Sequence, residues 1–211
     1  MLLAGAKGHA KEILEILSKN GETDLVCFDD VNKDSPLILF NLFRILTNLE
    51  TARDYFAGND KRFVLAIGGT LVRQKLEQKI TGIGGILHSV ISCNSHVSSY
   101  DVNLQQGINI MQGVIIQPSV TIGRSTLINA GSIIHHDSSI GSYCEICPSV
   151  TVTGRCNIGD YTFIGTGAVI KPDVRIGNHV IVGAGSVVNK DVPDGCTVAG
   201  VPARILAKKH D

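Results

Sequence analysis

Two adjacent histidines followed by an aspartate stand out in residues 129–141, NAGSIIHHDSSIG, because the surrounding side chains are mostly small or aliphatic. Imidazole titrates near neutral pH and is the side chain best suited to proton transfer. A carboxylate beside it, such as that of Asp137, can orient the ring or stabilise its charged form. We therefore consider His135 and His136 as candidates for general acid–base catalysis, with a solvated surface imidazole as the alternative.

A second pattern with possible chemistry is Cys144-x-x-Cys147, a spacing found in redox and zinc sites. The chain has six cysteines but no second pair at zinc-finger spacing. A zinc carbonic anhydrase would need three imidazoles converging on one metal. The outward histidines 135, 136 and 179 have no second pair at matched spacing, so we expect no metal cofactor.

The residues around both motifs repeat every six positions. Every sixth residue from 122 to 188 is Ile or Val, and Ile116, Ile110 and Leu104 extend the row backwards. Glycines recur every 18 residues within the same array, at Gly123, Gly141, Gly159 and Gly177. This period is typical of a parallel β-helix, in which three hexapeptides form one triangular coil and coils stack about 4.8 Å apart. The aliphatic residue and the residue two places before it are predicted to point inward.

The register of this repeat gives the cysteine motif a structural explanation. Cys144 and Cys156 occupy the inward phase, two places before Ile146 and Ile158. A buried thiol behaves as a compact hydrophobic group. We therefore favour core packing over redox chemistry for these cysteines.

The same register predicts that His136 and Asp137 face outward, two and three places after the inward Ile134. Gly154 occupies the position equivalent to His136 in the next coil, 18 residues later. Because glycine has no side chain, this position would leave a slot where a ligand could meet backbone N–H groups. His135 directly follows Ile134, in a phase that we interpret as a tight corner. We therefore expect the ring of His135 to be displaced from the reacting group.

The first 85 residues follow a different pattern, in which short apolar runs alternate with helical periodicity. The predicted strands are residues 1–4, 25–28 and 62–67, and the predicted helices are 9–20 and 71–80. Such alternation predicts a small parallel α/β sheet. Residues 31–60 show the weakest pattern. We predict two domains, a Rossmann-like α/β subdomain at 1–85 and a β-helix domain at 86–211.

The first predicted helix begins after a glycine turn. Gly5 and Gly8 would let the backbone approach a phosphate, and a helix starting near His9 would offer its N–H groups to the anion. The spacing is G-x-x-G, not the G-x-G-x-x-G of dinucleotide sites, so we do not predict NAD. Asp29 and Asp30 end the second strand, where open parallel sheets bind ligands, with a plain turn as the alternative.

The overall composition excludes several classes of partner. Basic and acidic residues number 19 each, so the chain has no excess of positive charge that would favour binding to nucleic acid or to an anionic membrane. The longest apolar stretch, PLILFNLFRIL, contains Asn41 and Arg44 and is shorter than the ~20 residues of a membrane span. The N-terminus shows no signal-peptide pattern. We expect a cytoplasmic protein with free thiols.

Several segments together resemble the bacterial left-handed β-helix acetyltransferases of the sialic acid O-acetyltransferase and nucleotide-amino-sugar N-acetyltransferase family. They are LAGAKGHAKEI, CFDD, LAIGGTLVRQKL, LINAGSIIHHDSSIG, the hexapeptide array and VAGVPARIL, and they cover nearly the whole chain. The resemblance implies that residues 1–85 form a Rossmann-like nucleotide-sugar-binding subdomain, an α/β unit with a small parallel sheet. It also implies that residues 86–211 form a left-handed parallel β-helix acetyltransferase domain. It also implies acetyl-CoA as the donor and a homotrimer with each active site between two β-helices.

The resemblance also implies roles for individual residues. The family's catalytic triplet matches His136 as general base and Asp137 as the following acid, while His135 replaces the preceding acid. The implied acceptor-binding residues are Gly5, Lys7, Gly8, His9, Asp29, Asp30, Gly68 and Asn129. The implied acetyl-CoA-binding residues are Glu145, Gly154, Gly165, Thr166, Ala184 and Lys190. Relatives often have a donor-binding histidine at the place of Glu145.

We expect the protein to acetylate the amino group of a nucleotide-linked 4-amino-deoxysugar. The amine would attack the thioester directly, with His136 removing its proton and backbone amides holding the oxyanion. O-acetylation of sialic acid or another sugar is the alternative, and the CFDD and sugar-domain motifs favour the nucleotide sugar. A zinc β-helix carbonic anhydrase and a non-catalytic binding scaffold are two further alternatives.

Overall fold

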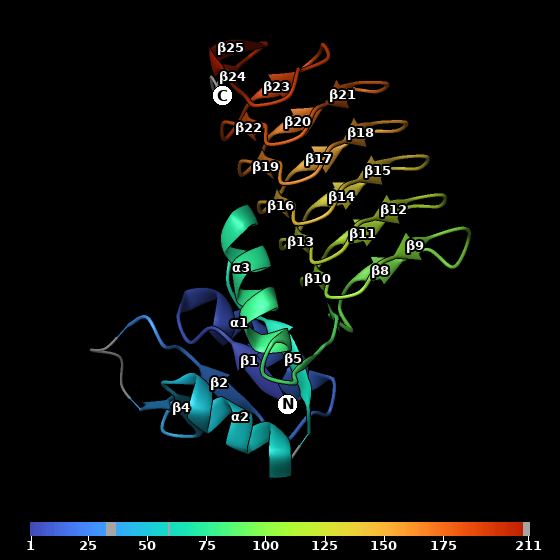
Figure 1. Cartoon of the computed structure of the whole chain (residues 1–211). Helices are drawn as coiled ribbons and strands as arrows, with labels where there is room; N and C mark the ends of the chain where they lie inside the picture. Colours follow the sequence, from blue (N-terminus) through green and yellow to red (C-terminus); the bar gives the residue numbers. More distant parts are fainter. Residues whose placement is uncertain (33–36, 59, 209–211) are drawn as a thin grey trace.

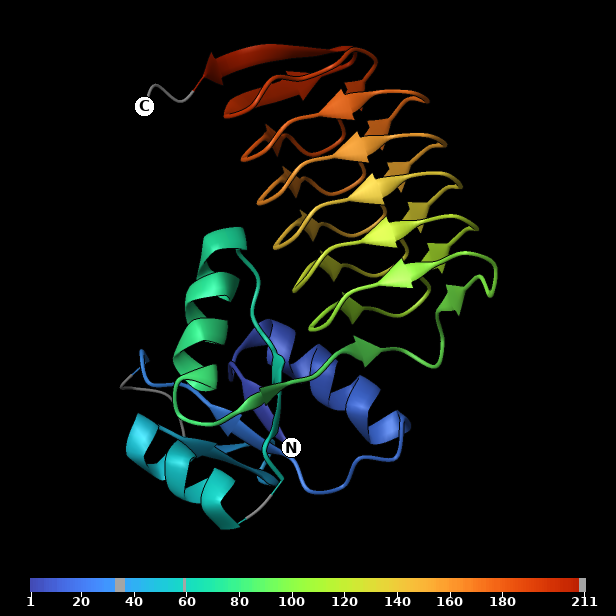
Figure 2. The ribbon, with the colours of Figure 1, turned by 45° about the vertical axis from the view of Figure 1, so that its right-hand side comes forward.

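The computed structural model describes residues 1–32, 37–58 and 60–208. They form an α/β domain attached beside the lower coils of a three-sided β-helix, whose coils rise towards a C-terminal hairpin (Figures 1 and 2). The predicted fold class is confirmed: a parallel α/β sheet is followed by a left-handed parallel β-helix. None of the helices in these three ranges is long and apolar enough to span a membrane.

The N-terminal sheet has the strand order β3-β4-β2-β1-β5-β6. Its strands are β1 (Leu2–Ala4), β2 (Val26–Phe28), β3 (Ile38–Leu39), β4 (Phe43–Leu46), β5 (Arg62–Leu65) and β6 (Ile86–Leu87). All neighbouring pairs are parallel except β3 and β4. The central strand β1 is wholly buried, as expected for an apolar strand covered on both faces.

Three helices pack on this sheet, α1 (Gly8–Lys19), α2 (Leu49–Gly58) and α3 (Thr70–Thr81). The buried residues of α1 follow the helical spacing seen in the sequence. Helix α2 lies in the part of the chain with the weakest pattern and was not predicted, because only Ala52 and Phe56 of it are buried. The buried face of α3 carries Arg73 and Glu77 beside Ile80.

The β-helix consists of three sheets of short strands, which we call the first, second and third faces. The first face contains β7 (Val90–Ile91), β10 (Asn109–Ile110), β13 (Leu127–Ile128), β16 (Glu145–Ile146), β19 (Phe163–Ile164), β22 (Ile181–Val182), β24 (Cys196–Gly200) and β25 (Ala203–Lys208). The second contains β8 (His96–Val97), β11 (Ile115–Ile116), β14 (Ile133–Ile134), β17 (Thr151–Val152), β20 (Val169–Ile170) and β23 (Val187–Val188). The third contains β9 (Asn103–Leu104), β12 (Thr121–Ile122), β15 (Ser139–Ile140), β18 (Asn157–Ile158) and β21 (Arg175–Ile176).

The inward row of aliphatic residues holds the coils together. Residues 18 apart are paired, as Ile116 with Ile134 and Ile134 with Val152. Every member of the row from Ile110 to Val188 is buried, and Leu104 in the first coil is half-buried. Cys144 and Cys156 are buried among them, which confirms the packing interpretation of the cysteine motif.

The corners lie two residues later than we expected. The residue with left-handed backbone is Asp137, with a φ of 58°, and Tyr143 and Arg155 occupy equivalent positions. His135 is therefore not at a tight corner, and its N–H still bonds the Val152 carbonyl at 2.9 Å. Glycines at positions equivalent to His135, such as Gly123, are required for another reason. A Cβ on Gly123 would lie 2.5 Å from the carbonyl carbon of Gly141 in the next coil. These glycines permit close stacking of coils.

A buried arginine joins α3 to the first coils. The Arg73 guanidinium donates from Nε to the Ser125 carbonyl at 2.8 Å, from Nη1 to the Ile67 carbonyl at 2.7 Å and from Nη2 to Asn109 Oδ1 at 3.2 Å. Burial lowers the pKa of Arg73 to about 10, and the carboxylates of Glu145 and Glu77 oppose that shift. The side chain stays charged at neutral pH and fixes the N-terminal domain to the first face.

Candidate active site

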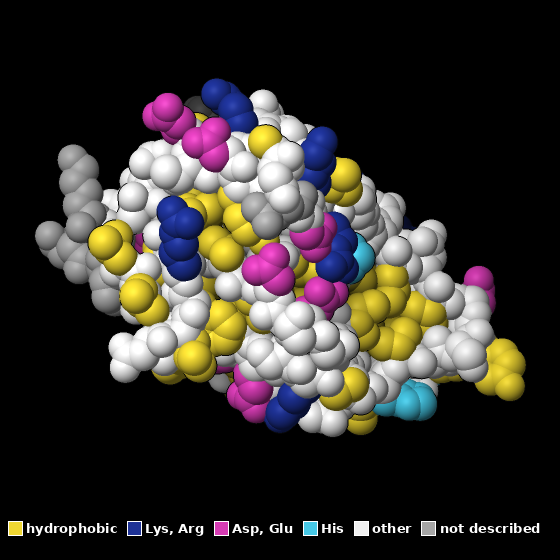
Figure 3. All heavy atoms as spheres, turned by 90° about the horizontal axis from the view of Figure 1, so that it is seen from below, with side chains coloured by type: hydrophobic (Ala, Val, Ile, Leu, Met, Phe, Trp, Pro, Cys, Tyr) yellow, Lys and Arg dark blue, Asp and Glu magenta, His cyan; other side chains and the backbone are white. Residues whose placement is uncertain are grey.

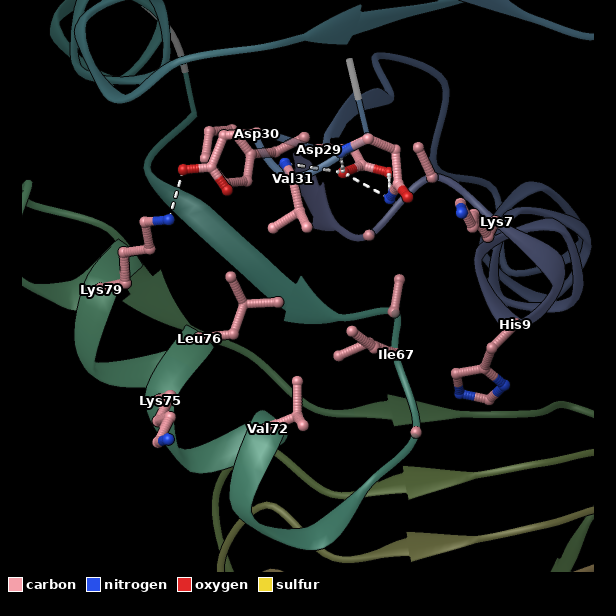
Figure 4. A pocket seen from close by; sticks show the side chains of 16 residues that line it. Lys7, His9, Asp29, Asp30, Val31, Ile67, Val72, Lys75, Leu76 and Lys79 are labelled. Atoms are coloured by element: carbon pink, nitrogen blue, oxygen red, sulfur yellow. Dashed lines mark hydrogen bonds and ion pairs between the residues drawn. The ribbon is translucent and has the colours of Figure 1, made fainter. Parts of the chain in front are cut away.

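A cavity of about 460 Å³ opens at the carboxyl ends of β1, β2 and β5, beside α3 (Figure 4). This volume suits a small-molecule ligand. Six of the predicted acceptor-binding residues line it: Gly5, Lys7, His9, Asp29, Asp30 and Gly68. Gly8 and Asn129 do not. The side chains of Val72 and Leu76 on α3 supply an apolar wall.

Asp29 organises the turn at one edge of this cavity. Its Oδ1 accepts hydrogen bonds from the N–H groups of Val31 and Asn32, both at 3.1 Å, and the Asn32 amide donates to its Oδ2 at 2.7 Å. Asp30 forms an ion pair with Lys79 across the cavity rim (Figure 4). Both aspartates thus have the structural partners that the turn interpretation requires, while they also line the cavity.

The opposite edge is formed by the glycine turn and the start of α1. Gly5 has a φ of 134°, and a Cβ there would lie 2.3 Å from the Ala66 carbonyl oxygen, so only glycine fits. Lys7 is the N-cap residue of α1, and Lys75 and Lys79 line the cavity from α3. Lys79 is paired with Asp30, so Lys7, Lys75 and the helix N-terminus supply the positive charge that an anion in this cavity would meet.

His9 lies at the inner end of the cavity. Its Nδ1 is 3.2 Å from Glu12 Oε2, and its buried Nε2 has no hydrogen-bond partner among the described residues. Burial lowers the pKa of His9, and the nearby Arg73 lowers it further. The ring is therefore neutral at pH 7, with Nδ1 donating to the carboxylate of Glu12.

His136 stands at the corner between the second and third faces. Its Nδ1 is 2.7 Å from Asp137 Oδ2, and the two side chains are 51% and 55% exposed. With Nδ1 donating to the carboxylate, Nε2 keeps its lone pair free to accept a proton. A Cβ on Gly154 would lie 2.8 Å from Cε1 and 2.9 Å from Nε2 of His136, so the His136 ring itself occupies the space that the missing side chain leaves.

The predicted acetyl-CoA-binding residues fall into three places. Gly154 and Lys190 follow His136 by one and three coils on the corner between the second and third faces. Gly165, Thr166 and Ala184 lie at the corner between the first and second faces. Both corners border the second face. Glu145 lies apart on the first face, where its Oε2 accepts a hydrogen bond from the Gly69 N–H at 2.6 Å.

A single chain keeps the cavity and His136 apart. All lining residues of the cavity belong to the N-terminal domain, which packs on the first face. The corner that carries His136 is opposite that face in the triangular section. The described residues also contain no group of three or more His, Cys, Asp or Glu placed to hold a metal ion.

Sequence reasoning missed the charged residues around these sites. Arg73 and Glu77 lie on the buried stripe of α3, and their spacing of four residues was the available signal. Arg155 follows Asp137 by one coil and pairs with Asp173 in the next, Nε to Oδ1 at 2.7 Å and Nη2 to Oδ2 at 3.0 Å. A search for charged residues 18 positions apart would have found the series Asp137, Arg155 and Asp173.

Two family models match the chain. One, described as the PglD N-terminal domain, covers residues 1–80, and the other, described as bacterial transferase hexapeptide (six repeats), covers residues 119–154 and 155–190. A comparison with curated proteins gave no significant match.

Solved structures match over nearly the full length. A mutant of perosamine N-acetyltransferase from Caulobacter crescentus, in complex with CoA and GDP-perosamine, is 32% identical, with 100% of this chain and 96% of that chain covered and a TM-score of 0.88. The acetyltransferase domain of PglB from Neisseria gonorrhoeae, in complex with acetyl coenzyme A, is 27% identical over 97% and 98%, with a TM-score of 0.87. WeeI from Acinetobacter baumannii is 28% identical over 97% and 98%, with a TM-score of 0.78.

Proposed function

The chain belongs to the family of bacterial left-handed β-helix sugar acetyltransferases, and we propose that it transfers the acetyl group of acetyl-CoA to the amino group of a nucleotide-linked 4-amino-deoxysugar. The observation that carries this proposal is the match along the whole chain to an N-acetyltransferase whose structure holds CoA and a nucleotide sugar. Both the sugar-binding domain and the β-helix take part in that match.

The N-terminal cavity is the proposed acceptor site. The diphosphate would lie against the start of α1, where Lys7 and the N–H groups after Gly5 present positive charge. The turn held by Asp29 and the apolar wall on α3 would contact the nucleoside. These contacts place the acceptor without taking part in the chemical step.

His136 is the proposed general base. The amine nitrogen attacks the thioester carbonyl, a C–N bond forms, and His136 Nε2 takes the proton that the nitrogen loses. The C–S bond then breaks, and the protonated His136 gives its proton to the sulfur, so that CoA leaves as its thiol and the base is regenerated. Asp137 Oδ2, 2.7 Å from Nδ1, holds the ring and stabilises the imidazolium, and the bare backbone at Gly154 leaves room for the ring.

The second face supports a homotrimer in which neighbouring chains share each site. The outward residues of its strands are His96 in the first coil and then the largely aliphatic row Ile115, Ile133, Thr151, Val169 and Val187. The outward residues of the third face are the polar row Asn103, Thr121, Ser139, Asn157 and Arg175. A second copy covering the apolar face would bring the corner of His136 towards the neighbour's cavity, and acetyl-CoA would lie between the corners that border this face.

The remaining part of the proposal concerns the setting of the enzyme. We propose a cytoplasmic location, where its six thiols would remain reduced. Acidic and basic side chains are interspersed on the underside of the molecule, without a field of one sign (Figure 3). This distribution agrees with a small-molecule acceptor and does not favour nucleic acid.

A single screen tests the proposed function. Purified protein is mixed with acetyl-CoA, a thiol-detecting reagent and a panel of UDP-, GDP- and dTDP-linked 4-amino sugars beside sialic acid. Thiol release that depends on a nucleotide-linked amino sugar is the expected result. Release only with sialic acid would identify an O-acetyltransferase, and no release with any acceptor would favour a binding scaffold.

A further inference from the structure

Glu145 reaches from β16 on the first face into the N-terminal domain. Its Oε2 accepts the Gly69 N–H at 2.6 Å. A Cβ on Gly68 would lie 3.0 Å from Oε1 and 3.2 Å from Oε2, so the carboxylate packs directly against this glycine pair. This contact links residues 76 positions apart and joins the two domains.

The carboxylate also occupies the positive end of a helix. Gly69 is the N-cap residue of α3 and has no side chain to cap the helix. Unpaired N–H groups and the helix dipole favour an anion at such an end. Glu145 supplies that anion from the β-helix, and its charge opposes the effect of burial, which lowers the pKa of both Arg73 and His9.

The segment that Glu145 holds is a wall of the cavity. Ile67 and Gly68 line the cavity, and the Ile67 carbonyl accepts a hydrogen bond from Arg73 Nη1 at 2.7 Å. Arg73 and Glu145 therefore hold the two ends of Ile67–Gly69. Arg73 is anchored on the β-helix by its hydrogen bond to the Ser125 carbonyl, and Glu145 is itself part of the β-helix. Losing either contact would let this wall of the cavity move.

We propose that Glu145 is a positioning residue for the acceptor, and not a donor-binding residue. It holds the Ile67–Gly69 wall in place and fills the anion site at the start of α3. The diphosphate of the acceptor is thereby directed to the start of α1 and Lys7, the other helix N-terminus at the cavity. This inference rests on the proposed function and departs from the role that the resemblance implied.

Steady-state kinetics with Glu145→Gln and Glu145→Ala test this role. The KM for the nucleotide sugar should rise about tenfold or more in Glu145→Ala, the scale of losing a hydrogen bond to a charged group, and less in Glu145→Gln, which keeps one oxygen. The KM for acetyl-CoA should stay within twofold. Glu50→Gln is the matched control, because Glu50 is an exposed carboxylate in the first turn of α2. A raised KM for acetyl-CoA with an unchanged acceptor KM would overturn the inference.

A double variant tests the geometry itself. Gly68→Ala alone should raise the acceptor KM, because its Cβ displaces the carboxylate. The same change should cost much less in the Glu145→Ala background, so the two effects should not add. Additive effects would show that the carboxylate and the glycine pair act separately, and would contradict the inference.

Calorimetric titration with UDP, GDP and dTDP separates this inference from the proposed reaction. The wild-type protein should bind one diphosphate that Glu145→Ala binds at least tenfold more weakly, whether or not any sugar is acetylated. Equal binding by both proteins would overturn the positioning role, even if the wild type proves to be an active acetyltransferase. Loss of thermal stability in Glu145→Ala with unchanged binding would also overturn it.

Discussion

At the scale of single residues, the corner of the β-helix at His136 depends on the absence of a side chain at Gly154. The ring lies within van der Waals distance of the next coil, and its Nδ1 is held by Asp137. The properties of His136 therefore depend on a residue 18 positions away as much as on its neighbour in sequence.

Gly154→Ala should lower kcat at least tenfold, because the added Cβ would lie under 3.0 Å from the ring and must displace it. The melting temperature should fall by only a few degrees, since the ring is half exposed and can move. Gly58→Ala is the control, because a Cβ there meets nothing within 4 Å. An unchanged kcat in Gly154→Ala would show that the slot is not used.

His9 should make the fold less stable in mild acid. Its folded pKa is lowered from the ordinary 6.5, so the unfolded chain binds the proton first as the pH falls. Stability is therefore complete above pH 6.5 and declines as the pH falls below that value. The free energy of unfolding, measured in urea between pH 7.5 and 5, should decline less in His9→Gln. Equal declines in both proteins would contradict the pKa direction.

The six-residue register was enough to predict that His136 and Asp137 face outward and that Gly154 lies beside His136 in the next coil. It could not predict hydrogen bonds that depend on rotamers, such as the contacts of Asp29 with Val31 and Asn32. It also missed the partner of Glu145, because Gly69 lies in the other domain and nothing in local periodicity reports such a contact.

At the scale of elements, α3 connects the cavity to the β-helix. Its buried face is charged at Arg73 because this side chain packs on polar groups, the Ser125 carbonyl and the Asn109 amide, while Ile80 on the same helix packs in the apolar core. The repeat predicted the β-helix strands, and the apolar runs predicted β1, β2 and β5. Helix α2 escaped prediction because its buried face is too narrow to produce a clear period.

Arg73→Met should lower the free energy of unfolding by about 3–5 kcal/mol, the usual cost of removing one partner from a buried charge network. The change removes the buried charge near Glu145 and Glu77, although Glu77 keeps its ion pair with Arg124, and it leaves three acceptors without this donor. Urea unfolding would measure this loss. Arg53→Met, at an exposed arginine of α2, is the control. Equal small losses in both variants would show that the α3 contact is not stabilising.

At the scale of the whole molecule, the cavity and His136 are far apart in the triangular section, and an apolar face lies unpaired between the corners predicted to hold the donor. A monomer would leave this face in water and the reacting groups separated. The sequence repeat indicated which residues form this face but not what covers it, because a repeat reports inward and outward directions only. The division at residues 85 and 86 stays a prediction.

Ile133→Asp should convert the protein to monomers and abolish acetyl transfer, because it places a charge on the apolar second face. Sedimentation equilibrium should give about three times 22.5 kDa for the wild type and one such mass for the variant. Ser139→Asp, at the equivalent outward position of the third face, should remain trimeric and active. A wild-type protein that sediments as an active monomer at micromolar concentration would contradict the shared site.

The turnover number of two single-histidine variants tests most directly whether His136 is the base of an N-acetyltransferase. The reaction is acetylation of the nucleotide-linked amino sugar identified by the screen, followed by thiol release and confirmed by the mass of the product. His136→Ala should lower kcat by about 10²–10⁴-fold while the acetyl-CoA affinity stays within severalfold, and His135→Ala should cost much less. If His135→Ala is the inactive variant and His136→Ala keeps its activity, His136 is not the base and the proposed mechanism is wrong.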